Sequence, residues 1–311
     1  MTSSRSIQMV VLGPSRVGKT TLLATMYKEI DKLGGAFTLL ADDDTSDRLG
    51  EAYSELAKIL NVQQFTIITE GLKGTHDFSK YRFDVQFQGT TEFELLFHDY
   101  RGGAMMSKGD DLDRLRTIIR QSHVIFNILD ATALMEATEP ESDQLNGHSK
   151  VAEILKHCLD DDGEYLVLFV LVKAETYVKN RRKRQELESR FERWHKQALN
   201  VVNKSHRGNV AGVLIPVCTL NCVEFKELDE QGSFVFVRNR GELRPKDVDQ
   251  PLRYALAFAI KHVEANKWFL EKFWDWLTGK QSQSASALKK FYETQKLGYR
   301  KYGNVGLLNG D

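Results

Sequence analysis

The most informative stretch of this chain is Gly13-Pro14-Ser15-Arg16-Val17-Gly18-Lys19-Thr20. It matches the pattern G-x-x-x-x-G-K-[ST], and a short apolar run at residues 7–12 comes directly before it. A helical pattern follows at residues 20–33, and Gly34-Gly35 closes it. These neighbours predict a strand, a tight loop and a helix in direct succession.

A glycine-bearing loop of this kind points successive backbone N–H groups at phosphate oxygens, and the positive end of the following helix adds to the attraction. The Lys19 side chain is expected to reach the β- and γ-phosphates, and the Thr20 hydroxyl is expected to bind Mg²⁺. The sequence therefore predicts a nucleotide-binding loop. Its expected contact residues are Gly13, Pro14, Ser15, Arg16, Val17, Gly18, Lys19, Thr20 and Thr21.

Apolar runs and helical patterns alternate through the rest of the chain. Buried strands are expected at residues 124–129, 165–172 and 210–217, and residues 81–87 and 93–97 are expected to form an antiparallel pair. This alternation predicts an α/β fold, a three-layer αβα sandwich of the P-loop NTPase type. Its sheet is expected to be mostly parallel with one antiparallel hairpin strand, and any ligand should lie at the carboxyl ends of the strands.

The expected domain covers residues 1–280, with insertions near 36–64, 131–148 and 220–245. The first insertion has a helical pattern, the second is expected to be a polar, acidic loop, and the third to hold a small hairpin near residues 234–241. One long charged helix is expected at residues 175–203, and another large helix at residues 249–279. Residues 281–311 form a basic C-terminal tail that is expected to be partly helical or disordered.

The composition excludes several classes of protein. The 43 Lys and Arg residues balance 43 Asp and Glu residues, so binding of nucleic acid by bulk charge is not expected. The longest apolar runs have about eight residues, whereas a membrane span needs about 20. Neither a span nor a secretory signal is expected. The chain has three cysteines, Cys158, Cys218 and Cys222, and they are expected to be reduced, buried thiols. A cytoplasmic location is therefore expected.

A second motif follows the predicted hairpin. Asp99-x-x-Gly102 comes directly after an apolar strand, and after a phosphate loop and a hairpin it resembles the switch motif of the Ras-like and translation-factor class of P-loop GTPases. The resemblance implies that Asp99 holds Mg²⁺ through water and that the Gly102 N–H meets the γ-phosphate. It also implies a threonine that completes the Mg²⁺ coordination. Thr75 stands at the matching place, and Thr66, Thr69 and Thr90 are the competing candidates.

The base-reading part of the family pattern is altered. The family has [NT]-K-x-D after the strand that corresponds to residues 165–172, and this chain has Val172-Lys173-Ala174-Glu175 there. By resemblance, Lys173 lies along the base plane and Glu175 accepts hydrogen bonds from guanine. Cys218-Thr219 stands where the family's last base-contacting loop falls. A strand-end lysine and a helix-start glutamate without contact to a base is the competing interpretation.

The residue that orients the attacking water in small GTPases is a glutamine directly after the motif glycine, and this chain has Gly103 there. Intrinsic hydrolysis of GTP is therefore expected to be slow. Arg101, Tyr100, His98 or a partner's residue are the candidates to supply the missing function. Arg16 is a candidate for a cis arginine that stabilises charge in the transition state, with a solvated surface position as its alternative.

These elements follow one another in the order of the GTPase class, so the chain resembles an enlarged GTPase of that class and, more narrowly, the double-GTPase domains of bacterial conflict systems. The resemblance implies a GTP- and Mg²⁺-dependent switch that signals to a protein effector or activating partner through the Thr75 and Asp99–Gly103 loops. A homodimer across the nucleotide face stays open. So do two other functions, an ATPase or small-molecule kinase, and a scaffold with permanently bound nucleotide.

Overall fold

The structure, a computed structural model, describes residues 6–30, 37–59, 64–66, 78–87, 89–100, 105, 109–159, 163–205, 208–239, 241–259, 295 and 298–308. Eight strands form its main sheet, in the order β11-β8-β7-β6-β1-β5-β4-β2. Their bounds are β1 Ser6–Leu12, β2 Phe37–Ala41, β4 Ser79–Phe87, β5 Thr90–Asp99, β6 Val124–Asp130, β7 Tyr165–Val172, β8 Val210–Pro216 and β11 Arg300–Gly303.

The centre of this sheet is parallel and its edges are antiparallel. Strands β5, β1, β6, β7 and β8 run in one direction, whereas β4 pairs antiparallel with both β5 and β2, and β11 pairs antiparallel with β8. Every residue of β6, β7 and β8 is buried, as expected of parallel strands that helices cover on both faces. The predicted α/β class, with its hairpin strand β4, is confirmed.

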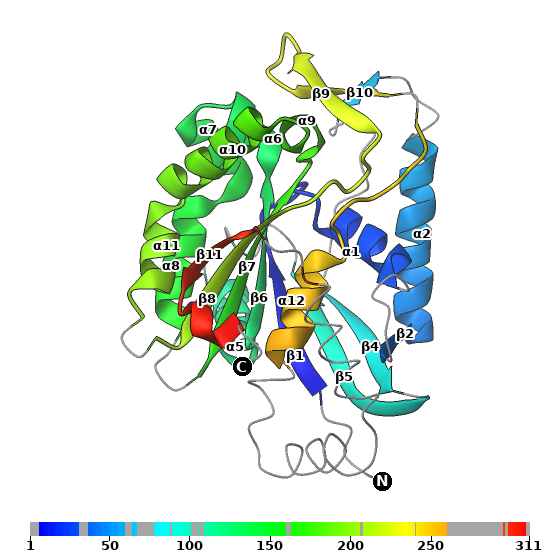
Figure 1. Cartoon of the computed structure of the whole chain (residues 1–311), viewed down its shortest axis with the longest axis vertical. Coiled ribbons are helices and arrows are strands. Elements are labelled where there is room, and N and C mark those ends of the chain that lie inside the picture. The colour runs from blue at the N-terminus through cyan, green and yellow to red at the C-terminus, as the bar shows by residue number, and fades with distance from the viewer. Residues whose placement is uncertain are drawn as a thin grey trace.

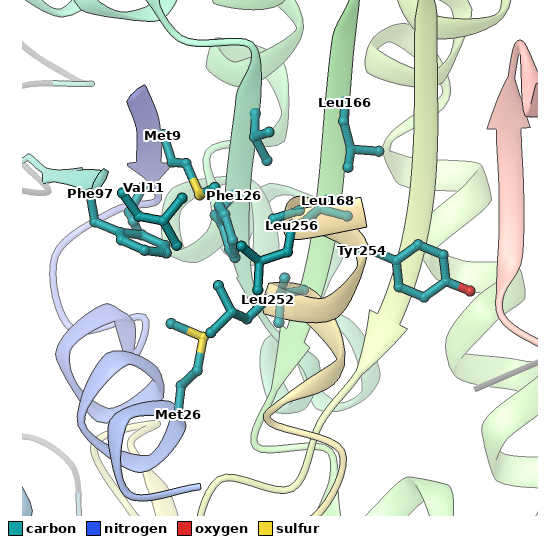
Figure 2. Packing of buried hydrophobic residues seen from close by; sticks show 14 of the residues in the cluster. Met9, Val11, Met26, Phe97, Phe126, Leu166, Leu168, Leu252, Tyr254 and Leu256 are labelled. Carbon is teal, nitrogen blue, oxygen red and sulfur yellow. The ribbon is translucent and has the colours of Figure 1, made fainter. Parts of the chain in front are cut away.

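Helices cover both faces of the sheet (Figure 1). On one face α1 and α12 pack against the strands, and Figure 2 shows Met26 of α1 and Leu252 and Leu256 of α12 beside Met9, Val11 and Phe126. Apolar residues of α5, α8, α10 and α11 pack on the other face. The helices are α1 Lys19–Lys28, α2 Asp43–Ile59, α5 Asp110–Gln121, α6 Ala131–Glu136, α7 Glu139–Asn146, α8 His148–Cys158, α9 Glu175–Val178, α10 Arg181–Trp194, α11 Lys196–Asn203 and α12 Gln250–Phe258.

Two of the predicted insertions meet in a second, three-stranded sheet. Its strands are β3 Gln64–Thr66, β9 Val223–Leu228 and β10 Phe234–Arg238, with β10 in the middle. The predicted hairpin exists, but its two strands turn between residues 228 and 234, before Gly241. The first insertion also supplies β2 to the main sheet, which the helical pattern alone did not indicate.

The structure contradicts two predictions about helices. The acidic segment 131–148 is not a loop, because the Asp130 carboxylate caps α6 and Thr138 with Glu141 forms a capping box for α7. The charged segment 175–203 is not one helix but three. Asn180 caps α10 by accepting hydrogen bonds from the Arg182 and Lys183 N–H groups, and this starts a new helix.

The end of the chain belongs to the fold. Strand β11 and the 3₁₀ helix η3 Val305–Leu308 lie within the predicted tail, and β11 extends the main sheet beside β8. Arg300 of β11 pairs with Glu188 and Glu192 of α10. The predicted helix over 249–279 is described only up to residue 259, and most of the tail lies outside the described residues. No helix among those described has the length and apolar character to cross a bilayer.

Candidate nucleotide site

The loop 13–18 follows β1 at the carboxyl end of the parallel strands. Strand β1 has β5 on one side and β6 on the other, so the strand order reverses there, and open α/β sheets bind ligands at such a point. Gly13 has φ 147°, and a Cβ there would lie 2.8 Å from the carbonyl oxygen of Ile128 on β6. Only glycine lets the loop pack this closely on the neighbouring strand.

The charged groups of the phosphate end are close together and buried. Lys19 Nζ donates to the Gly13 and Pro14 carbonyl oxygens at 2.9 and 3.1 Å. Burial lowers the pKa of Lys19, and the Asp99 carboxylate opposes this shift. Asp99 ends β5 in register with Val11 of β1, so the strand pairing brings the second motif to the first. The Lys19 ammonium suits a polyanion, whose phosphates compete with the loop carbonyls for it, and the Asp99 carboxylate suits a cation that accompanies the phosphates.

The donor set at this end fits the Mg²⁺ that the family pattern implies. A threonine hydroxyl, Thr20, lies in the first turn of α1, and the fully buried carboxylate of Asp99 lies one strand away from the loop. Mg²⁺ prefers oxygen ligands and is usually held by one or two protein groups together with substrate phosphates. Within the described residues no group of three or more His, Cys, Asp or Glu side chains forms a complete metal site. A site shared with a nucleotide fits this arrangement.

The base end begins at Lys173, which follows β7. Its backbone has φ 57°, and its Nζ lies 3.5 Å from the Arg16 carbonyl oxygen in the phosphate loop. The same ammonium forms an ion pair with the Asp130 carboxylate at the end of β6. Arg16 has φ 65° and an exposed side chain. The structure therefore brings the Lys173 side chain against the phosphate loop.

Glu175 lies beside the loop that follows β8. Its side chain is buried, with 4% of the residue exposed, and its Oε1 accepts hydrogen bonds from the N–H groups of Leu220 and Asn221 at 3.0 and 3.2 Å. Burial raises the pKa of Glu175, and these two N–H groups oppose the shift. The first turn of α9 is thus tied to the segment that the sequence predicts to contact the base.

Cys218 and Thr219 are both buried, and each is 3% exposed. Cys218 exchanges two backbone hydrogen bonds with Lys246, at 3.0 and 2.9 Å, which fixes the loop after β8 against the segment before α12. Burial, and then the charge of Glu175, raise the pKa of the Cys218 thiol to about 12. This cysteine is therefore a neutral, packed group, and Lys246 engages both hydrogen-bonding groups of its backbone.

Several predicted site residues lie outside the described part of the chain. They are Thr75, Arg101, Gly102 and the hydrolysis position Gly103. His98 and Tyr100 are described, and both rings contact Phe78, at centroid distances of 5.6 and 5.0 Å. Successive side chains of a strand point to opposite faces, so His98 lies on the face opposite Asp99. Burial and the charge of Lys80 lower the pKa of His98 to about 4.

Two further polar residues lie at this site and were not predicted from the sequence, Asp130 and Asn146. Asp130 Oδ1 accepts hydrogen bonds from the Thr132 and Ala133 N–H groups, and Asn146 of α7 bonds to the backbone of Asp130. An acidic residue directly after a buried strand is a usable signal for Asp130. The sequence offers no such signal for Asn146, because its contact with Asp130 depends on how α7 folds back.

Three crystal structures are among the solved structures similar to this chain. They are the S. cerevisiae Ski7 GTPase-like domain bound to GTP (11% identity, TM-score 0.42), the same domain bound to GDP and inorganic phosphate (14%, 0.43), and Sup35 complexed with GDP (10%, 0.34). The matched regions cover 68%, 74% and 70% of this chain. They cover 43%, 46% and 38% of the chains in those structures, so this chain spans less than half the length of each. No curated protein matches the chain.

The sequence model of one family, Double-GTPase 2, matches residues 8–211. This range is well over half of the 311 residues, and it runs from β1 through the phosphate loop, Asp99 and Lys173 to the start of β8. The buried Lys19, at the start of α1, and the buried Asp99, at the end of β5, agree with a family of GTPases. The chain belongs to the Double-GTPase 2 family, which supports a GTP-binding protein.

Proposed function

We propose that this protein is a guanine-nucleotide-dependent switch with slow intrinsic GTP hydrolysis, which signals to a protein partner. The observation that carries the proposal is the meeting of Lys19, in its glycine-bearing loop, with Asp99 at the carboxyl ends of β1 and β5. The phosphates of a triphosphate are the natural partners of the Lys19 ammonium, and the accompanying Mg²⁺ is the natural partner of the Asp99 carboxylate. The family assignment supports guanine as the base.

At the phosphate end, the backbone N–H groups of the loop and the start of α1 bind the α- and β-phosphates. Lys19 neutralises the β- and γ-phosphates. Thr20 and Thr75 would bind Mg²⁺ and Asp99 would hold it through water, and the ion would supply charge neutralisation. The Gly102 N–H meets the γ-phosphate, so that only the triphosphate engages the loops of Thr75 and Asp99–Gly103.

At the base end, Lys173 covers one face of the base, while Glu175 and the Cys218-Thr219 loop face its edge. Glu175 Oε1 orients the N–H groups of Leu220 and Asn221. The loop that contacts the base is therefore held by a carboxylate rather than by packing alone.

A second candidate, an ATPase or small-molecule kinase, is favoured by one observation. Glu175 is 4% exposed, and one of its oxygens already accepts two backbone N–H groups. Guanine is distinguished from adenine by its N–H donors, and an acceptor that is partly engaged discriminates less. The relative affinities for guanine and adenine nucleotides separate the two candidates.

Hydrolysis is slow in this proposal because Gly103 has no side chain to orient water. Arg16 and Arg101 are the groups of the chain proposed to stabilise the transition state, with an activating partner as a further source. Gly103→Gln is expected to raise single-turnover phosphate release. An unchanged rate contradicts the assignment of this position and directs the search to another residue or to the partner.

The switch itself is tested by hydrogen exchange. With a non-hydrolysable GTP analogue and Mg²⁺, amide exchange in peptides that contain Thr75 or Asp99–Gly103 should be slower than with GDP. Lys19→Met removes the ammonium and keeps the side-chain length, so the difference should vanish in this control. Equal exchange with the two nucleotides, both bound, contradicts the switch and favours a scaffold.

A further inference from the structure

A network of buried polar groups lies behind Lys173 at the ends of β6 and β7. Asp130 and Val172 are in register as the last residues of these parallel strands, so Lys173 leaves the sheet next to Asp130. The Asp130 side chain is 7% exposed and that of Lys173 is 16% exposed. An ion pair shielded from water to this degree is costly to break by removing one partner.

The two oxygens of Asp130 have separate partners. Oδ1 accepts hydrogen bonds from Thr132 N–H at 2.8 Å and Ala133 N–H at 3.1 Å, which caps α6. Oδ2 accepts from the Lys173 ammonium. The cap fixes the plane of the carboxylate, and the fixed carboxylate sets where the ammonium lies.

Asn146 holds the backbone of Asp130 on both sides. Its Oδ1 accepts from Asp130 N–H at 2.6 Å, and its Nδ2 donates to the Asp130 carbonyl oxygen at 3.2 Å and to Ser142 Oγ at 3.3 Å. Asn146 is fully buried at the end of α7. The segment 131–148 therefore folds back on the strand that it follows and stiffens the end of that strand.

Lys173 needs such support. Its backbone is in the left-handed region at φ 57°, which is strained for a residue with a Cβ. The preceding residue gives no polar support, since Val172 makes an apolar contact and its Cγ2 would lie 3.2 Å from a Cβ on Gly18. The Lys173 ammonium nevertheless lies 3.5 Å from the Arg16 carbonyl oxygen. The ion pair with Asp130 is therefore one of the contacts that hold the Lys173 ammonium against the phosphate loop.

We propose that Asp130, fixed by Asn146, is a positioning residue that holds Lys173 across the phosphate loop and so sets the affinity for the base end of the nucleotide. The proposal rests on the proposed function, because Lys173 acts on a guanine nucleotide only if one binds. The phosphates are bound by Lys19 and the loop, which Asp130 does not contact in the described structure. The loss of Asp130 should therefore weaken GTP but not a triphosphate that lacks a base.

The test compares Asp130→Asn, Lys173→Met and the double variant. Asp130→Asn keeps an oxygen for the cap of α6 and removes the charge. Binding of GTP, GDP and inorganic tripolyphosphate is measured by calorimetry with Mg²⁺. Asp130→Asn should lose about tenfold in affinity for GTP and GDP alike and nothing for tripolyphosphate, about the loss that one charge-assisted contact produces. Lys173→Met should lose as much, and the double variant no more than either single variant.

Glu136→Gln is the matched control. Glu136 is an exposed carboxylate of α6 whose hydrogen bond comes from Tyr177 Oη, at 3.0 Å, and not from Asp130 or Lys173, so its variant should bind all three ligands as the wild type does. Wild-type GTP affinity in Asp130→Asn, with a loss in Lys173→Met, overturns the positioning role. Equal losses of GTP and tripolyphosphate also overturn it, because they indicate a role in the phosphate loop.

Asn146→Ala covers the case in which Asp130→Asn does not fold. It leaves both charges in place and removes the support of the Asp130 backbone. It should show a smaller loss confined to GTP and GDP, and unchanged GTP affinity in this variant counts against the proposal. A wild-type protein that binds tripolyphosphate but no guanine nucleotide overturns the proposed function instead, so the two failures are distinguishable.

Discussion

The Glu175 side chain connects the start of α9 to the loop after β8, and both lie at the candidate base-binding end of the site. Its Oε1 accepts hydrogen bonds from the backbone N–H groups of Leu220 and Asn221, and Glu175 itself is the first residue of α9. Asn221 has φ 54°, a left-handed conformation that asparagine adopts more readily than most residues. The carboxylate therefore shapes the loop 218–221 in addition to any direct contact with a base.

Glu175→Ala should weaken binding of GTP strongly and of ATP only slightly, since in the proposed site the carboxylate and its loop face the N–H donors of guanine. Removal of one hydrogen-bonded carboxylate is expected to cost about 1.5–3 kcal/mol of GTP binding. Calorimetric titration with both nucleotides measures the two losses. Glu186→Ala, at an exposed ion pair with Arg190, is the control. Equal losses for GTP and ATP contradict a role in reading the base.

At this scale the sequence predicted the residues whose roles depend on local spacing. The loop 13–20 fixes its own geometry, so the place of Lys19 follows from the spacing of the motif alone. Asp99 was predictable because it directly follows an apolar strand. Asn146 was missed because its contact with Asp130 joins the end of a strand to a helix residue 16 positions later. No local pattern encodes that distance.

Among the secondary-structure elements, α8, α10 and α11 meet around two buried histidines. The rings of His148 and His195 are 5.2 Å apart, and His195 stacks on Phe191 at 4.6 Å. Burial, and then the charge of His148, lower the pKa of His195 to about 3. Burial also lowers the pKa of His148, against the charges of Asp143 and Glu139. These helices therefore pack on neutral imidazoles.

Acid should destabilise this contact in a defined range of pH. The unfolded chain takes up a proton on His195 below its ordinary pKa of 6.5, whereas the folded chain does so only near 3. The free energy of unfolding therefore falls as the pH drops through this range, by about 1.4 kcal/mol per pH unit for one histidine. In His195→Leu, the loss of stability between pH 7.5 and pH 5 should be smaller by about 2 kcal/mol.

Urea denaturation at the two pH values measures this difference. His157→Leu is the control, because the His157 side chain is exposed and its variant should keep the wild-type pH dependence. The same pH dependence in His195→Leu and in the wild type would show that His195 is not neutral in the folded protein.

Strand β11 provides a second prediction at this scale. Gly303 has φ 67°, and a Cβ there would lie 2.3 Å from the Val210 carbonyl oxygen of β8. Gly303→Ala should therefore lower the free energy of unfolding by more than about 1 kcal/mol, because backbone strain and a backbone clash act together. Gly232→Ala is the matched control, since Gly232 has φ 76° and no atom within 4 Å of an added Cβ. Equal losses in urea denaturation contradict the packing of β11 on β8.

The sequence predicted the elements that carry continuous apolar runs. Strands β6, β7 and β8 were found because parallel strands buried on both faces are almost continuously apolar. Strand β11 was missed because all four of its residues are half-buried at the edge of the sheet. Helices α6 and α7 were missed because caps at Asp130 and Thr138, rather than apolar spacing, start them.

At the scale of the whole molecule, elements added to the nucleotide-binding fold lie next to its candidate base-reading end. The second sheet, β3-β10-β9, is tied to this end, where Phe225 N–H donates to Thr176 Oγ1 at 2.9 Å and Lys179 pairs with Glu224. Figure 1 shows β9 and β10 beyond the carboxyl ends of the central strands. A change in the second sheet can therefore reach the site through α9.

The central claim is that the site prefers guanine and distinguishes triphosphate from diphosphate. Calorimetric titration of nucleotide-free protein with non-hydrolysable GTP and ATP analogues and with GDP, all with Mg²⁺, tests it most directly. We expect tighter binding of the GTP analogue than of the ATP analogue, and a difference of about tenfold, or about 1.4 kcal/mol, between the GTP analogue and GDP. A preference for the ATP analogue, or no binding of any of the three, would contradict this claim.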